Sequence, residues 1–486
     1  MIVSNAVQPG TLDPVSGRVG GRQWGRRGDD AGEDPVEFGD HHDESEVRRH
    51  SAITAIAGMA VYGSALITSP LTARALGPGG RGDLTAVVGP TQVYLWIMTF
   101  GLPMAALYFA SQYPPRKLLM GAWAWGLAAG TLFAAIVWKY IPIYLHHHDP
   151  ETIFWFRAFV VAAIPFVPCY VSLDLLLARR KVVAYNALRL IPYAINLVAL
   201  VVLAIIGQLD LRNALAASFG SHVIWFVIVF TVCGTWPGRG FDRHVFTRQI
   251  QYGARVAPGT LSEFVVARLD QLVLVGMVTS ASLGRYAVAV NVAGVSQPIA
   301  YGIVSTVFPR LRTTKDVESG KELNRIALRY AWIASLAISG LIAVATPFVI
   351  PWVFGDDFRG AVVLVLLLLP GQVAQNIGIV LAGRLQAVGR PGRASQGQLL
   401  AAGVTGLGLW FFIGTFGIVA AAVVTSVSQL VYLLYIWWHV RSAPHVELSE
   451  EELAGMAQAT SAAGSDVAEE EAEVALAPLR EGRSVD

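Results

Sequence analysis

The chain has little charge and very little cysteine. Only 14% of its 486 residues are charged, against about a quarter in soluble proteins, so it cannot cover several water-facing domains. Its two cysteines, Cys169 and Cys233, lie in apolar stretches, which argues against a disulfide framework or a cysteine metal site. The net charge of +2 gives no reason to expect a nucleic-acid partner. The first 50 residues hold no apolar run, so we expect no cleavable signal peptide.

Motifs of common enzymes are also missing. The sequence has no Walker A loop, no Gly-x-Ser-x-Gly elbow and no His-Glu-x-x-His pair, so it predicts no ATP hydrolysis by this chain. Three consecutive histidines, His146 to His148, cannot all face one metal ion from a regular element. The pair Asp356-Asp357 is typical of a solvated turn or a helix cap. We therefore expect no catalytic residues, no metal and no cofactor.

What the chain has in abundance is apolar sequence. It is 54% hydrophobic, with a mean hydropathy of +0.52, and apolar runs long enough to cross about 30 Å of hydrocarbon recur along it. This pattern predicts an all-α membrane protein with about twelve transmembrane helices. The expected spans are 52–73, 84–109, 118–140, 153–178, 183–206, 214–236, 254–278, 285–308, 326–350, 360–383, 395–413 and 417–440.

Basic residues alternate between the expected loops, as the retention of Lys and Arg on the cytoplasmic side requires. Roughly twenty lie on one side and seven on the other. The richer loops include Arg116-Lys117 and Arg179-Arg180-Lys181, whereas Arg74 and Arg81 are among the scattered cations of the poorer side. This pattern predicts that both termini are cytoplasmic.

Composition and an internal repeat divide the chain into four parts. We expect a disordered tail at 1–50, six-helix bundles at 51–240 and 241–441, and an acidic disordered tail at 442–486. Leu76-Gly77 in the first bundle corresponds to Leu283-Gly284 in the second, about two hundred residues on. Two halves of six helices insert in the same orientation, and transporters of this kind bind substrate where the halves meet.

The expected helix at 254–278 carries three charges near its midpoint: Glu263, Arg268 and Asp270. Each costs about 2.5–3.5 kcal/mol if it faces lipid, so pairing or water is required. Seven residues separate the two acids, which would place both on one face of a continuous helix. Two interpretations stay open: a water-accessible cavity, or a structural ion pair between helices.

Other polar side chains lie at membrane depth. Individually they favour interhelical hydrogen bonds, and together they suit a neutral lining for sugar hydroxyls. The candidates are Gln92, Asn291, Gln297, Gln375 and Asn376. Arg189 lies near the Arg179-Arg180-Lys181 loop. It either extends to the interface or attracts a phosphate at the cytoplasmic mouth of a cavity.

Several short motifs resemble the polysaccharide and oligosaccharide flippases of the multidrug/oligosaccharidyl-lipid/polysaccharide exporter superfamily. They are Arg74-Ala75-Leu76-Gly77-Pro78, Arg268-Leu269-Asp270, Leu283-Gly284-Arg285-Tyr286, Phe308-Pro309-Arg310-Leu311 and Phe354-Gly355-Asp356-Asp357-Phe358. The similarity to this family covers residues 52–440, which include both halves of the chain. The resemblance implies two parallel six-helix bundles around a central cavity and an outward flip of an undecaprenyl-diphosphate-linked glycan.

On this basis we expect a flippase of the bacterial inner membrane that works by alternating access and is not an enzyme. Arg268 and Arg189 would contact the diphosphate, and Glu263 and Asp270 would couple to protons or sodium. The expected partners are the bilayer, the lipid-linked glycan and polysaccharide polymerase or glycosyltransferase machinery. Two alternatives stay open: a drug or cation exporter of the same superfamily, and a polytopic glycan polymerase or ligase.

Overall fold

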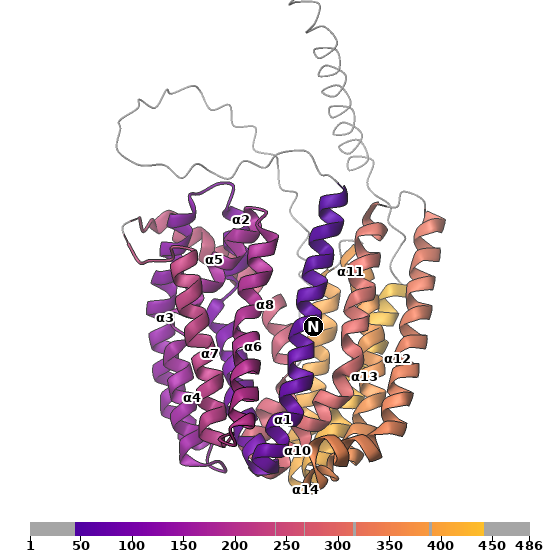
Figure 1. Ribbon diagram of the computed structural model, residues 1–486. Coiled ribbons are helices and arrows are strands. Elements are labelled where there is room, and N and C mark those ends of the chain that lie inside the picture. The colour runs from indigo at the N-terminus through magenta and orange to yellow at the C-terminus, as the bar shows by residue number, and fades with distance from the viewer. Residues whose placement is uncertain (1–43, 239, 267, 314–316, 388–390, 442–486) are drawn as a thin grey trace, which may run out of the picture. The chain divides into compact units, whose positions relative to one another are not determined.

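The computed structural model describes residues 44–238, 240–266, 268–313, 317–387 and 391–441. They all belong to one compact unit, Pro35–Asp486. Every regular element in these ranges is a helix (Figure 1), so the all-α class is confirmed. The expected tails lie outside the described residues, apart from 44–50, which begin the first helix.

The first half of the chain forms seven helices. They are α1 (Glu44–Thr99), α2 (Leu102–Phe109), α3 (Pro115–Tyr144), α4 (Pro150–Ala162), α5 (Phe166–Ala178), α6 (Val182–Ile205) and α7 (Leu211–Val232). The second half holds α8 (Arg243–Val266), α9 (Leu269–Met277), α10 (Ser280–Ala293), η1 (Gly294–Ser296), α11 (Gln297–Thr313), α12 (Val317–Phe354), η2 (Asp356–Phe358), α13 (Ala361–Ala387) and α14 (Pro391–Arg441).

Among the described residues, eight helices are long and apolar enough to cross a membrane, or nine if α4 and α5 are one bent span. Two of the eight are far longer than one crossing needs: 44 residues in α1 and 50 in α14. Each contains a glycine with left-handed backbone, Gly77 (φ 66°) and Gly417 (φ 55°), where the helix kinks. The count of twelve stays a prediction. Outward-facing apolar side chains such as Phe348, 77% exposed, suit contact with lipid.

Four expected helices are interrupted, so those boundaries are wrong; the one at 285–308 consists of α10, the short 3₁₀ turn η1 and α11. The expected helix at 84–109 breaks at Phe100 and Gly101, which both have positive φ. The one at 153–178 is the pair α4 and α5, bent by 52°, and the one at 254–278 is α8 and α9. Conversely, α12 continues through Pro347 and Pro351, and it ends only before Gly355 (φ 103°). Glycine tolerates positive φ, whereas proline interrupts a single hydrogen bond that neighbouring helices in a membrane bundle can replace.

The helices form two groups with α1 and α10 between them. In Figure 1, α3, α4, α5 and α7 lie together, and α11, α12 and α13 lie together. The backbones of α1 and α10 nearly touch. A Cβ added to Gly82 would lie 1.7 Å from the Ser280 carbonyl oxygen, and one added to Gly284 would lie 2.0 Å from that of Pro78. Glycine is therefore required at both positions.

Helix α8 contacts both halves. The Gln249 amide donates a hydrogen bond to the Leu118 carbonyl of α3, at 3.2 Å, and Gly253 packs on the backbone at Phe100 and Gly101. The expected domain boundary at residue 240 therefore lies beside a helix that packs on the first half, and it stays a prediction.

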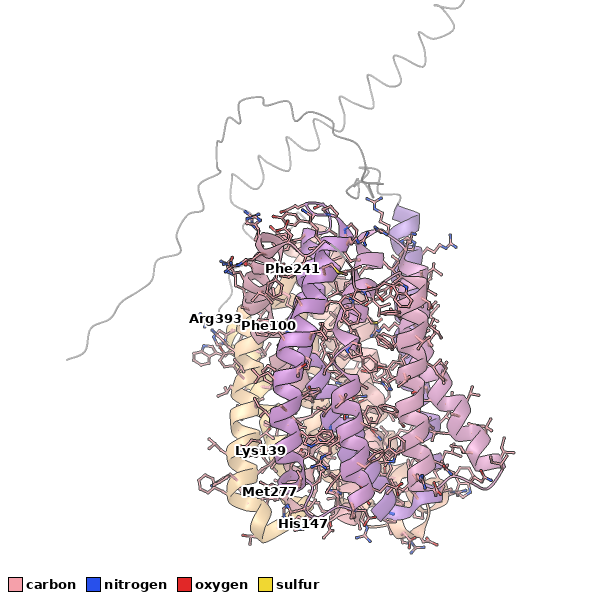
Figure 2. All side chains as sticks on the ribbon, turned by 90° about the vertical axis from the view of Figure 1, so that its left-hand side faces the viewer. Phe100, Lys139, His147, Phe241, Met277 and Arg393 are labelled. Carbon is pink, nitrogen blue, oxygen red and sulfur yellow. The ribbon has the colours of Figure 1, made fainter. Side chains whose placement is uncertain are left out.

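The two ends of the molecule carry different loops. Figure 2 shows Phe241 at one end, and His147 and Met277 at the other. This agrees with the alternation of loops in the sequence, which predicts that the α7–α8 linker is cytoplasmic and the α3–α4 loop external.

Candidate functional site

The helix that carries the three charges is interrupted beside Arg268. Helix α8 ends at Val266, and Arg268 has non-helical backbone (φ −131°, ψ 0°) immediately before α9. The face expected to be shared by Glu263 and Asp270 requires a continuous helix, so that expectation is wrong. The side chain of Glu263 lies outside the described residues. Discontinuous helices at membrane depth are typical of transporter binding sites.

Asp270 is 6% exposed and belongs to a polar network inside the second half. The Tyr286 hydroxyl donates to its Oδ2 at 2.5 Å, and the Gln271 backbone N–H donates to Oδ1 at 2.7 Å. Thr425 on α14 is 3.5 Å from Oδ2. These contacts favour the structural interpretation for Asp270, since its carboxylate already holds helices α9, α10 and α14 together.

Arg268 instead faces the first half of the chain. Its guanidinium donates to Gln271 Oε1 at 3.1 Å, and that oxygen lies near Gly89 of α1. Arg189 on α6 is exposed, and among the described residues it has no hydrogen-bond or ion-pair partner. Both guanidiniums act electrostatically on the hydroxyls of Tyr62 and Tyr193. Arg189 and Arg268, from opposite halves, therefore both lie within electrostatic reach of Tyr62 and Tyr193, and Arg189 also acts on the Asp174 carboxylate.

The amide candidates divide into two groups. Asn376 is buried and donates to Ser296 and Ser335, at 2.9 and 3.3 Å, which makes it an interhelical contact within the second half. Asn291 of α10 donates to Ser69 of α1, at 3.1 Å, across the two halves. Among the described residues, the side chains of the other three have no hydrogen-bond partner and are partly exposed. These three are Gln92, Gln297 and Gln375. They are the amides left available for a ligand.

Arg81 is a residue whose position the sequence did not predict. It was expected in an external loop, but its guanidinium turns inward, donating to Thr72 at 2.9 Å and to Ser69 at 3.4 Å. Its Nε is buried without a partner, and Arg268 acts electrostatically on it. The sequence signal was weak, because the Gly-Pro-Gly-Gly-Arg-Gly stretch resembles an ordinary turn. Arg81 extends the positive charge between the halves.

Two further features lie away from this cluster. An open apolar groove of about 680 Å³ runs between α6 and α7, lined by residues such as Ile195, Val198 and Ala217. At the other side of the first half, Asp242 pairs with Lys117 at 2.9 Å and accepts hydrogen bonds from the first backbone N–H groups of α8. These contacts lower the pKa of Asp242.

Among the described residues no group of three or more His, Cys, Asp or Glu could hold a metal ion.

Comparison with known proteins identifies the family. Residues 47–315, more than half of the chain, match the family described as polysaccharide biosynthesis protein, and the chain belongs to that family. It is also similar to the probable low-salt glycan biosynthesis flippase Agl15 of Haloferax volcanii, with 22% identity over 163 residues. That match covers 33% of this chain and 34% of the relative, so the chain spans about a third of the length of the curated relative it matches.

Solved structures show the same fold. A multidrug resistance MATE family transporter of the MOP superfamily, in an inward-facing conformation, has a TM-score of 0.63 and 12% identity, covering 80% of this chain and 97% of the other. The lipid II flippase MurJ, in an inward closed conformation, has a TM-score of 0.64 and 12% identity, covering 82% and 88%. The chain is therefore a multi-pass membrane protein with the two-lobed fold of these transporters.

Proposed function

We propose that the chain is a flippase that moves a polyprenyl-diphosphate-linked glycan across the membrane by alternating access. The observation that carries this proposal is the interruption of the helix at Arg268, whose guanidinium donates to Gln271 and lies, with Arg189 of the opposite half, within electrostatic reach of Tyr62 and Tyr193. A diphosphate is the anionic group of such a lipid, and arginine binds phosphate oxygens through paired N–H donors. Gln92, Gln297 and Gln375 then offer free amides to sugar hydroxyls. The central cavity that would hold the headgroup stays a prediction.

Charge distinguishes this function from the drug-exporter alternative. Two exposed or half-exposed guanidiniums, with Arg81 nearby, repel a cationic drug and attract an anionic headgroup. Family membership and the fold of known transporters favour transport over the polymerase or ligase chemistry also weighed from the sequence. Agl15 is described as a probable glycan biosynthesis flippase and MurJ as a lipid II flippase, and these descriptions support a flippase of glycan precursors here.

The conformation and the location are part of the same proposal. The two solved structures with TM-scores of 0.63 and 0.64 are described as inward conformations, whereas an outward-facing MATE transporter has a TM-score of 0.53. In this chain α1 and α10 touch at the end that holds the α3–α4 loop. We therefore assign an inward conformation, closed at the predicted external end. The excess of basic residues in alternate loops supports cytoplasmic termini, and the expected location is the bacterial inner membrane. Polysaccharide polymerase or glycosyltransferase machinery would be the partner.

Binding of a soluble analogue tests the site. The purified protein in detergent is titrated with farnesyl diphosphate, with farnesol as the neutral control. Loss of a charge-assisted hydrogen bond is worth about 1.5–3 kcal/mol, so Arg268→Ala and Arg189→Ala should each weaken diphosphate binding about tenfold to a hundredfold. Arg393→Ala is the matched control, because Arg393 is exposed and its hydrogen bond within the described part of the chain is to Gln396. If Arg268→Ala, Arg189→Ala and Arg393→Ala bind farnesyl diphosphate equally tightly, the assignment of the diphosphate site is wrong.

A further inference from the structure

Two cations, Arg157 on α4 and Lys139 on α3, lie on the outer surface of the first half. Phe154 and Val161, three residues before and four residues after Arg157, are 63% and 49% exposed. Residues at these spacings share one face of a helix, and an exposed apolar face of a membrane-spanning helix contacts lipid. Arg157 therefore lies within the lipid-facing stripe of α4, and Lys139 is exposed beside it on α3.

Both cations lie near the level of the lipid headgroups at the predicted external end. Arg157 follows the start of α4 at Pro150, and Lys139 precedes the end of α3 at Tyr144. At 1.5 Å per residue, their Cα atoms lie about 10 Å and about 8 Å from that end of the helices, and the polar part of one leaflet is about 5–7 Å thick. The Cα–Cβ bond of Arg157 tilts toward the N-terminus of α4, which is the external end, so the side chain extends toward the headgroups. Figure 2, which looks at this surface, shows Lys139 toward the end that holds His147.

Stacking on Trp138 holds the guanidinium of Arg157 and leaves its edge available. The Arg157 Cζ lies 4.6 Å from the centroid of the Trp138 ring, so the ring covers one face of the planar group. The N–H donors point outward in the plane, and stacking does not use them. Among the described residues Arg157 has no hydrogen-bond or ion-pair partner, and its Nε is buried without one. The terminal N–H donors therefore need an acceptor from outside the chain.

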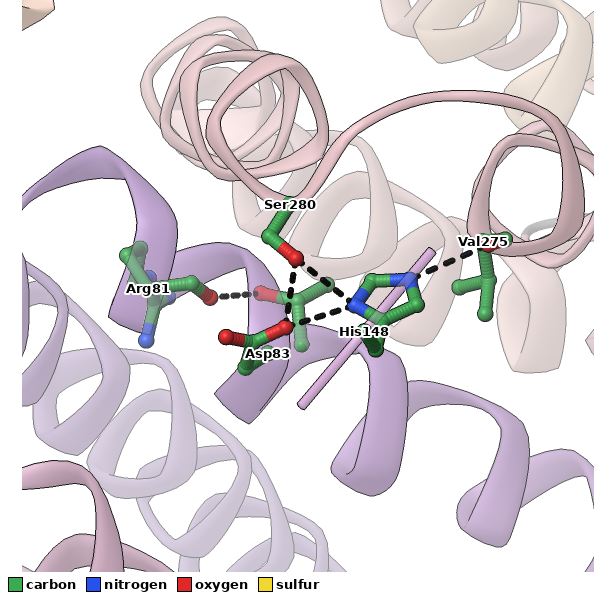
Figure 3. A network of polar contacts seen from close by, with 6 residues as sticks. Arg81, Asp83, His148, Val275 and Ser280 are labelled. Carbon is green, nitrogen blue, oxygen red and sulfur yellow. Dashed lines mark hydrogen bonds and ion pairs between the residues drawn. The ribbon is translucent and has the colours of Figure 1, made fainter. Parts of the chain in front are cut away.

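The acids at this end of the first half have other partners or face water. The partnered acids are Asp83 with His148 at 2.6 Å (Figure 3), Glu151 with Arg212 at 3.7 Å, and Asp210 with the Asn213 backbone N–H at 2.7 Å. Asp149, immediately before α4, is exposed. Within the part of the chain that the structure describes, the charges of Arg157 and Lys139 are therefore not matched by a carboxylate.

We propose that Arg157, with Lys139 beside it, binds the phosphate of an anionic phospholipid in the leaflet at this end. Arginine binds phosphate oxygens through paired N–H donors, and the lipid phosphate is the anion present at this level of the bilayer. The acyl chains of the same molecule lie along the apolar stripe of α4, and Trp138 and Tyr140 are the aromatic side chains typical of this interface. The site is formed by α3 and α4, whereas the proposed diphosphate site involves α1, α6 and α9.

Native mass spectrometry of the purified full chain, released from detergent, counts bound lipid and tests this site. The protein is titrated with dioleoylphosphatidylglycerol and, separately, with dioleoylglycerol, which has the same chains and no phosphate. We expect the phospholipid to be retained and dioleoylglycerol to be lost. Arg157→Ala should weaken phospholipid binding about tenfold to a hundredfold, the range of a charge-assisted hydrogen bond, and Lys139→Ala about twofold to fivefold. Arg359→Ala, at an exposed arginine of the same end that pairs with Asp356 at 2.9 Å, should leave binding unchanged.

Arg157→Gln, which removes the charge and keeps a polar side chain, decides the assignment if Arg157→Ala does not fold. Equal phospholipid binding by the unsubstituted chain and Arg157→Gln would overturn the proposal, and so would equal retention of the two lipids. An excess of inorganic phosphate should not displace the phospholipid, because the acyl chains contribute to binding; displacement would indicate a site for a soluble anion and contradict the lipid assignment. Farnesyl diphosphate is absent from these titrations, so failure here is separate from a failure of diphosphate binding at Arg189 and Arg268.

Discussion

Replacing Gly82 with alanine should force the two halves apart where α1 and α10 touch. The added Cβ would lie 1.7 Å from the Ser280 carbonyl oxygen, about 1.6 Å short of the roughly 3.3 Å at which carbon and oxygen make an ordinary contact. The nearest atoms are backbone, so side-chain rotation cannot relieve the clash. Overpacking of this kind costs about 1–3 kcal/mol, and the cost falls on the closed state.

Spin labels at Arg212→Cys and Asp357→Cys, in a background with Cys169 and Cys233 replaced by alanine, measure the distance between the two halves at this end. Since about 1.4 kcal/mol changes an equilibrium tenfold, Gly82→Ala should raise the ratio of open to closed protein by about fivefold to more than a hundredfold at a fixed pH. Gly79→Ala is the matched control, because a Cβ at Gly79 meets nothing within 4 Å and the gain in helix propensity is similar. If Gly82→Ala and Gly79→Ala give the same distances, the close approach of α1 and α10 does not define the closed state.

The remaining predictions concern other contacts. Tyr286→Phe removes the 2.5 Å hydrogen bond to Asp270, so it should lower the unfolding free energy by about 1.5–3 kcal/mol, measured as a lower melting temperature in detergent; Tyr435→Phe, at a hydroxyl in an exposed contact, should change it little. The lowered pKa of Asp242 means that the Lys117 contact stabilises the fold above the ordinary carboxylate range. This stability is lost as pH falls through the lowered pKa, so Asp242→Asn should reduce acid sensitivity; equal acid unfolding in the two proteins would contradict this.

The sequence predicted the helices better than their interruptions. Apolar length and basic loops located the spans, and Arg268 was recognised because a charge in an apolar run is costly. The break at Arg268 was missed, since arginine favours helix. Gly77 and Gly284 were identified as a repeat, but their roles differ: Gly77 adopts positive φ, whereas Gly284 allows close packing.

The contact between Asp83, His148 and Ser280 could not be predicted from the sequence (Figure 3). His148 follows two histidines that are exposed, and nothing local distinguishes it from them. Its partners Asp83 and Ser280 are 65 and 132 residues away along the chain, and only the contact between α1 and α10 brings them together. Arg189 and Arg268 come within electrostatic reach of the same two tyrosines for the same reason, because long-range packing places α6 and α9 against α1.

Movement of a lipid-linked sugar across a bilayer tests the central claim most directly. The purified chain is reconstituted into vesicles that carry a fluorescent polyprenyl-diphosphate sugar, and a membrane-impermeant quencher reports its appearance in the opposite leaflet. The account predicts rapid transfer with the unsubstituted chain and with Arg393→Ala, and at least a tenfold slower rate with Arg268→Ala and Arg189→Ala. Transfer no faster than in protein-free vesicles, or unchanged in the Arg268 and Arg189 variants, would contradict it.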